Sequence, residues 1–210
     1  PITNAPIRLA HDSVEIAGQT NGLGEASFTL YYEDDYDVSI GKWSYFTLCE
    51  ELVIDETTAA LNYELGSGYY DDFSFDYGWS SFGTATDGLW ERAIPNPTGE
   101  DPSQSINPYP DSDKDCGDYA FVTGNGATTN DNVSNGSVTL ISPVFDLSSY
   151  DDPYIHYERW FFNFFGPENP NDTLFFRLSN GVDNVIIDYA AGNPANFHKW
   201  ISVTKRVQDY

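Results

Sequence analysis

Acidic side chains alternate with other residues in segment 111–118, which reads DSDKDCGD. In a tight loop, alternate side chains can converge on one cation, and Ca²⁺ prefers carboxylate and carbonyl oxygens. The match to an EF-hand loop is partial, because Cys116 stands where that pattern has Gly and no Glu closes the loop. The segment therefore predicts a calcium site, with a solvated acidic loop as the alternative. Its ligands would be Asp111, Asp113, Asp115 and Asp118.

The three histidines, His11, His156 and His198, are scattered along the chain. The sequence has no HExxH motif, no Gly-x-Ser-x-Gly nucleophile turn and no Cys–His pairing signal. His156 and Glu158 would share one face of a strand, which favours a packed histidine beside a rim carboxylate over a catalytic site. Nothing singles out two of the 33 acidic residues as a glycosidase pair. We therefore expect a protein that is not an enzyme.

The charge balance is strongly acidic, because 9 Lys and Arg face 33 Asp and Glu, for a formal net charge of −24. Such a chain repels phosphate backbones and anionic membrane surfaces, so neither nucleic acid binding nor membrane insertion is expected. No apolar run approaches the roughly 18–20 residues of a membrane span. Aromatic residues make up 16% of the chain, which predicts a folded core rather than disorder. The surplus of Asp fits either a solvated acidic surface or bound cations.

Two further features concern the chain's chemistry outside the acidic segment. The two cysteines, Cys49 and Cys116, are interpreted either as a disulfide or as two small buried thiols, because spacing does not fix connectivity. The chain begins with Pro1 and contains no Met, so we expect a processed product or a fragment of a longer protein.

Short β-type runs separated by Gly, Asn, Asp and Pro must position these residues. No stretch of residues 1–66 keeps a 3.6-residue period, and turn signals recur roughly every 8–12 residues, which is typical of β-sandwiches. We predict an all-β fold with a small β-sandwich over residues 1–66, a junction at 66–68 and a jelly-roll β-sandwich over 69–210.

The expected strands of the first unit begin at Pro6 and then cover residues 26–32, 36–40, 51–55 and 58–65. A Pro-rich loop is expected over residues 95–115, because Pro fits neither a helix interior nor a central strand. Arg159, inside the aromatic run 154–165, is expected to reach the rim of the sheet or a carboxylate. The expected strands of the second unit cover residues 119–123, 137–140, 144–147, 153–165, 173–179, 184–189 and 200–207.

Family resemblances cover nearly the whole chain. The first unit resembles the carboxypeptidase regulatory-like domain, a transthyretin-like sandwich, through PITNAPIRLA, TNGLGEASFTL and YDVSIGKWSYFT. The second resembles a jelly-roll module, distantly similar to MAM and galactose-binding domains, that occurs in secreted Bacteroidetes proteins of the type IX system. The segments that carry this likeness are YYDDFSFDYGW, GLWERAIP, DYAFVTGNG and LISPVFDLSSYDDPYIHYERWFFN. The resemblance implies an extracellular or cell-surface accessory part of a larger protein. It also implies a further strand or two after Tyr210, so the jelly-roll is expected to be incomplete at its C-terminal end.

The resemblance further implies that a cation ties the first jelly-roll strand to the loops at one end. Asp71 and Asp72 then become a second set of calcium ligands, with a turn capped by Asp72 as the alternative. Asp12-Ser13-Val14 and Asp172-Thr173-Leu174 resemble the Asp–Ser/Thr–apolar sequence that Bacteroidetes use for O-glycosylation. Ser13 and Thr173 are therefore candidate glycosylation sites, with chance matches as the alternative.

The leading hypothesis is a non-catalytic surface, adhesion or binding module that calcium stabilises. Its partners would be other domains of the same polypeptide, neighbouring copies, or carbohydrate stacked on surplus aromatic rings. The first alternative is a structural subunit of an extracellular fibre or tube, because an incomplete jelly-roll leaves a sheet edge open to strand addition. The second is an accessory part of a secreted peptidase or glycoside hydrolase. The surplus aromatic residues are Trp43, Tyr45, Phe46, Trp79, Trp90 and Trp160.

Overall fold

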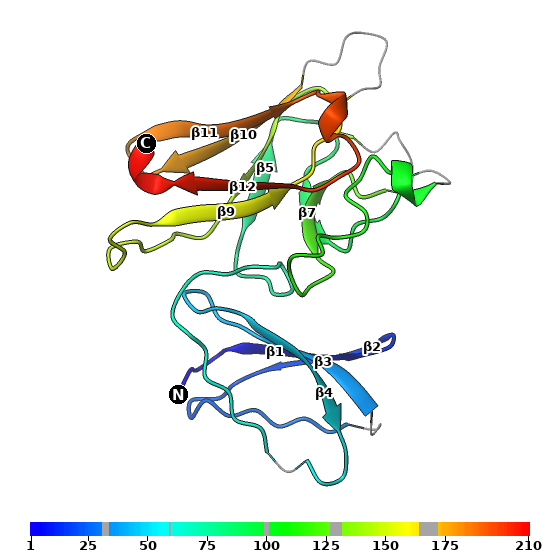
Figure 1. Ribbon diagram of the computed structural model, residues 1–210, viewed down its shortest axis with the longest axis vertical. Coiled ribbons are helices and arrows are strands. Elements are labelled where there is room, and N and C mark those ends of the chain that lie inside the picture. The colour runs from blue at the N-terminus through cyan, green and yellow to red at the C-terminus, as the bar shows by residue number, and fades with distance from the viewer. Residues whose placement is uncertain (31–33, 59, 99–100, 127–131, 164–171) are drawn as a thin grey trace. The chain divides into compact units, whose positions relative to one another are not determined.

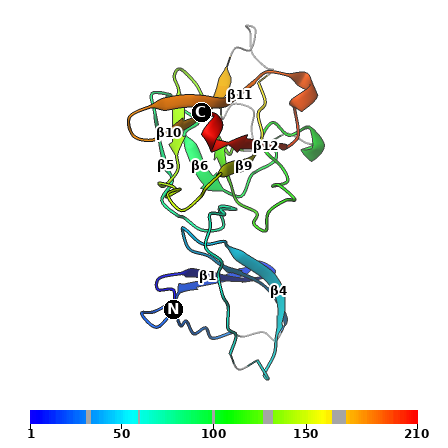
Figure 2. The ribbon, with the colours of Figure 1, turned by 60° about the vertical axis from the view of Figure 1, so that its left-hand side comes forward.

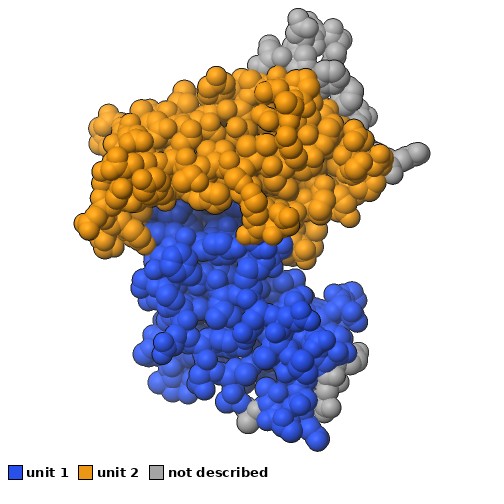
Figure 3. Space-filling view, in the orientation of Figure 1, with its two compact units in different colours: residues 1–79, 115–117, 142–145 blue, residues 80–114, 118–141, 146–210 orange. Residues whose placement is uncertain are grey.

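The computed structural model describes residues 1–30, 34–58, 60–98, 101–126, 132–163 and 172–210. Within these ranges the chain forms twelve β-strands and three 3-10 turns of three residues each, so the predicted all-β class is confirmed (Figure 1). The chain divides into two compact units, which Figure 3 colours separately. Unit 1 comprises residues 1–79, 115–117 and 142–145, and unit 2 comprises residues 80–114, 118–141 and 146–210. The junction expected at 66–68 lies inside unit 1.

Unit 1 is built on one antiparallel sheet of four strands in the order β2-β1-β3-β4. A two-residue turn joins the first two strands, and Asp12 adopts φ +50° there, a conformation that Asp tolerates better than most residues. β3 ends at Ile40, the last residue of the predicted run 36–40. The strands are β1 (Pro6–His11), β2 (Val14–Gln19), β3 (Asp34–Ile40) and β4 (Leu48–Ile54).

The core of unit 1 lies on one face of this sheet. Its centre is a buried cluster of Leu9, Tyr36, Val38 and Ile40. Residues 26–30 and 60–65, both expected to be strands, form no ladder, so those two strand predictions are wrong for the described residues. They instead cover the sheet as extended chain, because their alternating apolar side chains pack against the cluster. Alternation reports burial on one side, and it does not supply a hydrogen-bonding neighbour. The packed side chains are Phe28, Leu30, Tyr63 and Leu65.

Unit 2 contains four antiparallel two-stranded ladders among its described residues (Figures 1 and 2). β10 and β11 contain a register shift between Phe176 and Arg177. The ladders are β5 (Ser80–Gly83) with β8 (Val138–Ile141), β6 (Trp90–Ala93) with β7 (Ala120–Thr123), β9 (Tyr154–Arg159) with β12 (Ile201–Arg206), and β10 (Thr173–Ser179) with β11 (Asn184–Ala191).

Two loop regions test the sequence-based predictions for this part of the chain. The expected strand at 144–147 is absent: Val144 is 86% exposed, and its carbonyl accepts a hydrogen bond from Trp43 Nε1 at 2.9 Å instead of joining a ladder. The Pro-rich stretch is a loop, as predicted. Its one regular element among the described residues is the 3-10 turn Pro102–Gln104, and its polar centre is Ser105, whose hydroxyl accepts a hydrogen bond from Thr98 N at 3.0 Å. Side-chain hydrogen bonds therefore hold this loop where no ladder can.

Contacts around Asp188 link the ladder β9–β12 to the ladder β10–β11. The rings of Tyr157 and Phe176 stack at 4.4 Å, and Tyr157 Oη donates to Asp188 Oδ2 at 3.0 Å. Arg159 Nε reaches the same carboxylate oxygen at 3.1 Å, so the expectation that this arginine meets a carboxylate is confirmed. Lys205 Nζ lies 3.7 Å from Asp188 Oδ1. The half-buried carboxylate of Asp188 thus contacts two cationic side chains and one phenol.

Candidate metal site

The candidate site begins at the tight segment that follows the first sheet. Phe73 N donates to Asp71 Oδ1 at 2.9 Å, and Ser74 N donates to Asp72 Oδ1 at 3.0 Å. These are two successive turns of the kind that Asp side chains stabilise. Phe73 between them adopts φ +60°, which is unfavourable for a bulky residue. Trp79 Nε1 donates to Asp71 Oδ2 at 2.8 Å, which fixes the second oxygen of that carboxylate.

Asp72 is the most unusual residue of this segment. It is only 1% exposed, and its Oδ2 atom has no hydrogen-bond partner among the described residues. The hydroxyl of Ser74, two residues later, is also buried without a partner. Burying a carboxylate costs several kcal/mol unless another charge or a set of donors compensates. Asp72 Oδ2 and the Ser74 hydroxyl are thus two buried oxygens, on side chains two residues apart, whose burial nothing among the described residues compensates.

Residues 115–117 approach the same place from a distant part of the chain. Cys116 forms a disulfide with Cys49 of β4, with the two Cα atoms 6.2 Å apart, which settles the alternative that the sequence leaves open. The two sulfur atoms lie within 4.8 Å of a carboxylate oxygen of Asp72. Because both sulfurs are used in the disulfide, no thiolate is available to bind a soft metal, and the oxygens remain as ligands.

Gly117 makes this approach possible. A Cβ atom placed on it would lie 2.6 Å from Ser74 Oγ and 3.0 Å from the backbone oxygen of Asp72, too close for any other residue without movement. Gly at this position therefore lets residues 115–117 pack against the turn 72–74 without displacing the Ser74 side chain.

The ionisation of Tyr70 reports that negative charges gather here. Burial raises the pKa of Tyr70 to about 12, and the carboxylates of Asp72, Asp115 and Asp71 add to the increase, in that order. The Tyr70 hydroxyl also lies 3.9 Å from Cys116 Sγ. The buried phenol therefore lies in the negative field of three carboxylates, of which Asp72 is fully buried.

The six predicted calcium ligands are divided between the two units. Asp71, Asp72 and Asp115 belong to unit 1, whereas Asp111, Asp113 and Asp118 belong to unit 2. Asp113 and Asp118 are exposed, and Asp111 is half-buried with Oδ1 accepting from Ser112 N at 2.8 Å. Sequence reasoning missed Ser74 and Gly117. The only local signal for them is their spacing, two residues after Asp72 and Asp115.

The candidate glycosylation residues differ in exposure. Ser13 is exposed in the turn between β1 and β2, where a modifying group would have room. Thr173 is half-buried as the first residue of β10, paired with Ala191.

The histidines and the surplus aromatic residues also have definite places. His156 Nε2 lies 3.2 Å from Glu158 Oε1 and its Nδ1 lies 2.9 Å from Thr204 Oγ1, so His156 and Glu158 share a face of β9 as expected. His198 Nδ1 lies 2.8 Å from the Ser105 carbonyl. Among the six surplus aromatic residues, only Phe46, at 51%, is exposed.

Comparison with protein-family models, with curated proteins and with solved structures finds no match for this chain. No helix among the described residues is long and apolar enough to cross a membrane.

Proposed function

We propose that this chain is a non-catalytic binding or adhesion part of a secreted or cell-surface protein and that Ca²⁺ stabilises it. Its units would be a carboxypeptidase regulatory-like domain and a jelly-roll module of the kind found in secreted Bacteroidetes proteins. One observation carries the calcium proposal: the carboxylate of Asp72 is fully buried and one of its oxygens has no partner.

The donor set decides which ion fits best. Asp72 Oδ2, the Ser74 hydroxyl and the carboxylate of Asp115 are hard oxygen donors, which Ca²⁺ prefers. Ca²⁺ also tolerates irregular geometry and completes its shell with backbone carbonyls and water, whereas Mg²⁺ demands a near-ideal octahedron. A bound cation would offset the mutual repulsion of the carboxylates and the cost of burying Asp72.

Two properties support an extracellular location. Disulfides form and persist mainly in oxidising compartments, and Cys49 and Cys116 are paired. A net charge of −24 keeps a protein soluble and is best tolerated where salt and divalent cations screen the charges.

The test is thermal unfolding of the whole chain with excess Ca²⁺ and with a chelator. At a free Ca²⁺ concentration 100 times the dissociation constant, binding to the folded state adds about 2.7 kcal/mol. For a chain of this size that corresponds to an increase in Tm of roughly 5–10 °C. Asp72→Asn should abolish the increase, and the matched control Asp113→Asn, at an exposed carboxylate, should retain it. An identical melt with Ca²⁺ and with chelator would overturn the proposal.

A second candidate function rests on the ladders of unit 2. Because each ladder has two strands among the described residues, each strand has one backbone edge outside any ladder there. Such edges favour strand addition from a neighbouring chain, as in a fibre or tube subunit. Electron microscopy of the concentrated protein would reveal ordered polymers under this alternative and dispersed particles under the first proposal.

A further inference from the structure

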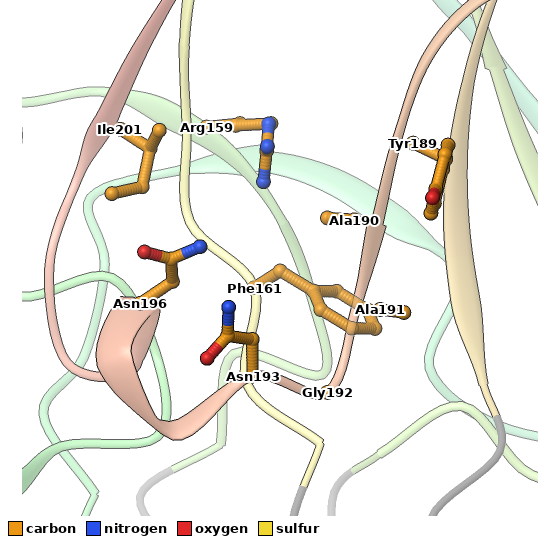
Figure 4. A pocket seen from close by; sticks show the side chains of 9 residues that line it. All are labelled: Arg159, Phe161, Tyr189, Ala190, Ala191, Gly192, Asn193, Asn196 and Ile201. Atoms are coloured by element: carbon orange, nitrogen blue, oxygen red, sulfur yellow. The ribbon is translucent and has the colours of Figure 1, made fainter.

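A small pocket in unit 2 lies where β9, β11 and the start of β12 meet (Figure 4). Its volume is about 240 Å³, below the roughly 300–1,000 Å³ of sites for drug-sized ligands, so it suits a ligand of about one sugar ring. Arg159, Phe161 and Tyr189 line it together with Asn193 and Asn196 of the connection between β11 and β12.

The polar groups of the pocket are mainly hydrogen-bond donors. The Arg159 guanidinium uses Nε for Asp188 at 3.1 Å, which holds the group in place and leaves its Nη atoms for another partner. Asn193 Oδ1 accepts a hydrogen bond from Ala195 N at 3.1 Å, so the side-chain amide nitrogen is the group that remains to donate to a ligand. In Figure 4 the side chains of Arg159, Asn193 and Asn196 surround one common space.

The charge of the described lining is opposite to that of the whole chain. Among the described residues the lining contains Arg159 and no carboxylate, although the chain carries a net charge of −24. Asp188 lies outside the lining and is shared between Arg159 and Lys205, at 3.1 and 3.7 Å, so one cationic charge remains in excess. A guanidinium is well suited to a carboxylate, which it can bind through two parallel hydrogen bonds.

One aromatic ring completes the pocket. Phe161 belongs to the lining, whereas the side chain of Tyr189, which pairs with Phe175, lies on the face of β11 opposite to Asp188, the partner of Arg159. An aromatic ring offers an apolar face on which a sugar ring can stack, while amides and a guanidinium bind its oxygens.

We propose that this pocket binds a single carboxylated sugar unit, such as the uronic acid at the end of an acidic glycan. Arg159 pairs with the carboxylate, Asn193 and Asn196 donate to it or to ring hydroxyls, and Phe161 offers the sugar ring an apolar face. The overall negative charge disfavours a long polyanion on the surface and confines recognition to one unit inside the pocket. This inference rests on the proposed function as a binding module and names its ligand class.

The test is calorimetric titration and saturation-transfer NMR of the whole chain, saturated with Ca²⁺, with sodium glucuronate and sodium galacturonate. At least one uronate should bind about tenfold or more tightly than glucose, acetate or inorganic phosphate, because only a uronate supplies both the ring and the carboxylate. Asn196→Ala should weaken uronate binding by about tenfold, the effect of losing one hydrogen bond to a charged group. The Asn196 side chain makes no hydrogen bond within the described residues, so this variant should keep the wild-type Tm. Asn184→Ala, an exposed asparagine at the start of β11, is the matched control and should bind normally.

Three results would overturn the inference: no measurable uronate binding, equal binding of glucose or of phosphate, or full binding by Asn196→Ala. Arg159→Lys gives a second readout, since it keeps the charge but loses the planar pair of donors, and it should also lose the preference for uronate. The calcium-dependent melt reports on unit 1 and does not involve this pocket. Failure of uronate binding with an intact calcium response would therefore refute the pocket alone.

Discussion

Removing the disulfide should destabilise unit 1 more than any single change on its surface. Cys49 and Cys116 are 67 residues apart in sequence, and closing a loop of that length removes unfolded-state entropy worth about 4.4 kcal/mol at 25 °C. The double variant Cys49→Ser/Cys116→Ser should lose roughly this amount from the free energy of unfolding. Since whole domains are stable by only about 5–15 kcal/mol, unit 1 would become marginal.

Hydrogen exchange measured by mass spectrometry separates the two units in this experiment. Amides in β3, at the centre of the unit 1 sheet, should lose protection by about a thousandfold, because each 1.4 kcal/mol is a factor of ten. Amides in β9 and β12 of unit 2 should be nearly unchanged. Wild-type protein with a reducing agent should reproduce the variant. Protection in β3 that falls less than tenfold in both samples would refute the loop-entropy reasoning.

Three further predictions concern ionisation, packing and ion pairing. Burial raises the pKa values of Tyr70 and Tyr77 to about 12 in the folded chain. The stability that the two neutral phenols contribute is therefore complete below pH 10 and is lost between pH 10 and 12. Tyrosinate absorbance should increase together with unfolding across that range. Leu9→Ala, in the buried cluster, should cost about 2–5 kcal/mol in urea denaturation, and a loss under 1 kcal/mol would mean that the cluster is loosely packed. Asp188→Ala should cost about 3 kcal/mol because it leaves two cations unpaired, whereas Arg206→Ala, at an exposed pair, should cost under about 1 kcal/mol in the same assay.

Much of the strand content follows from alternation of apolar residues. β1, β3, β4 and β7–β12 each overlap a predicted run. β2, β5 and β6 lie outside the predicted runs. In β2 five of the six residues are polar, small or exposed, and Gly18 interrupts the pattern. Segments 26–30 and 60–65 alternate just as clearly, yet they form no ladder, although β2 and β4 are edge strands of the sheet; their apolar side chains pack against the buried cluster instead. Whether an alternating segment joins the edge of a sheet or covers its face is a property of the folded chain that no local pattern contains.

The candidate metal site was only partly predictable for the same reason. Two adjacent acids at 71 and 72 and the acidic run 111–118 are visible in the sequence. Which of them become buried depends on the disulfide, which brings Asp115 toward the first sheet, and on Gly117, which permits the close approach. Ser74 becomes a candidate ligand only because Asp72, two residues earlier, has a buried oxygen without a partner among the described residues. Alternating acids predict convergence on one ion, whereas the chain assigns the members of that run to different units.

Unit 1 is assembled from three separate stretches of chain, and this affects its biosynthesis. The sheet strands and the turn 72–74 leave the ribosome first, but residues 142–145, which complete the unit, follow roughly 66 residues after Trp79. At about 5–20 residues per second, that delay lasts about 3–13 s. During that interval the partner thiol of Cys49 emerges only midway, so the nascent sheet must remain reduced and exposed until then. A chain truncated after Trp79 would carry all four strands of unit 1 and still lack the partner of Cys49 and the residues that complete the unit.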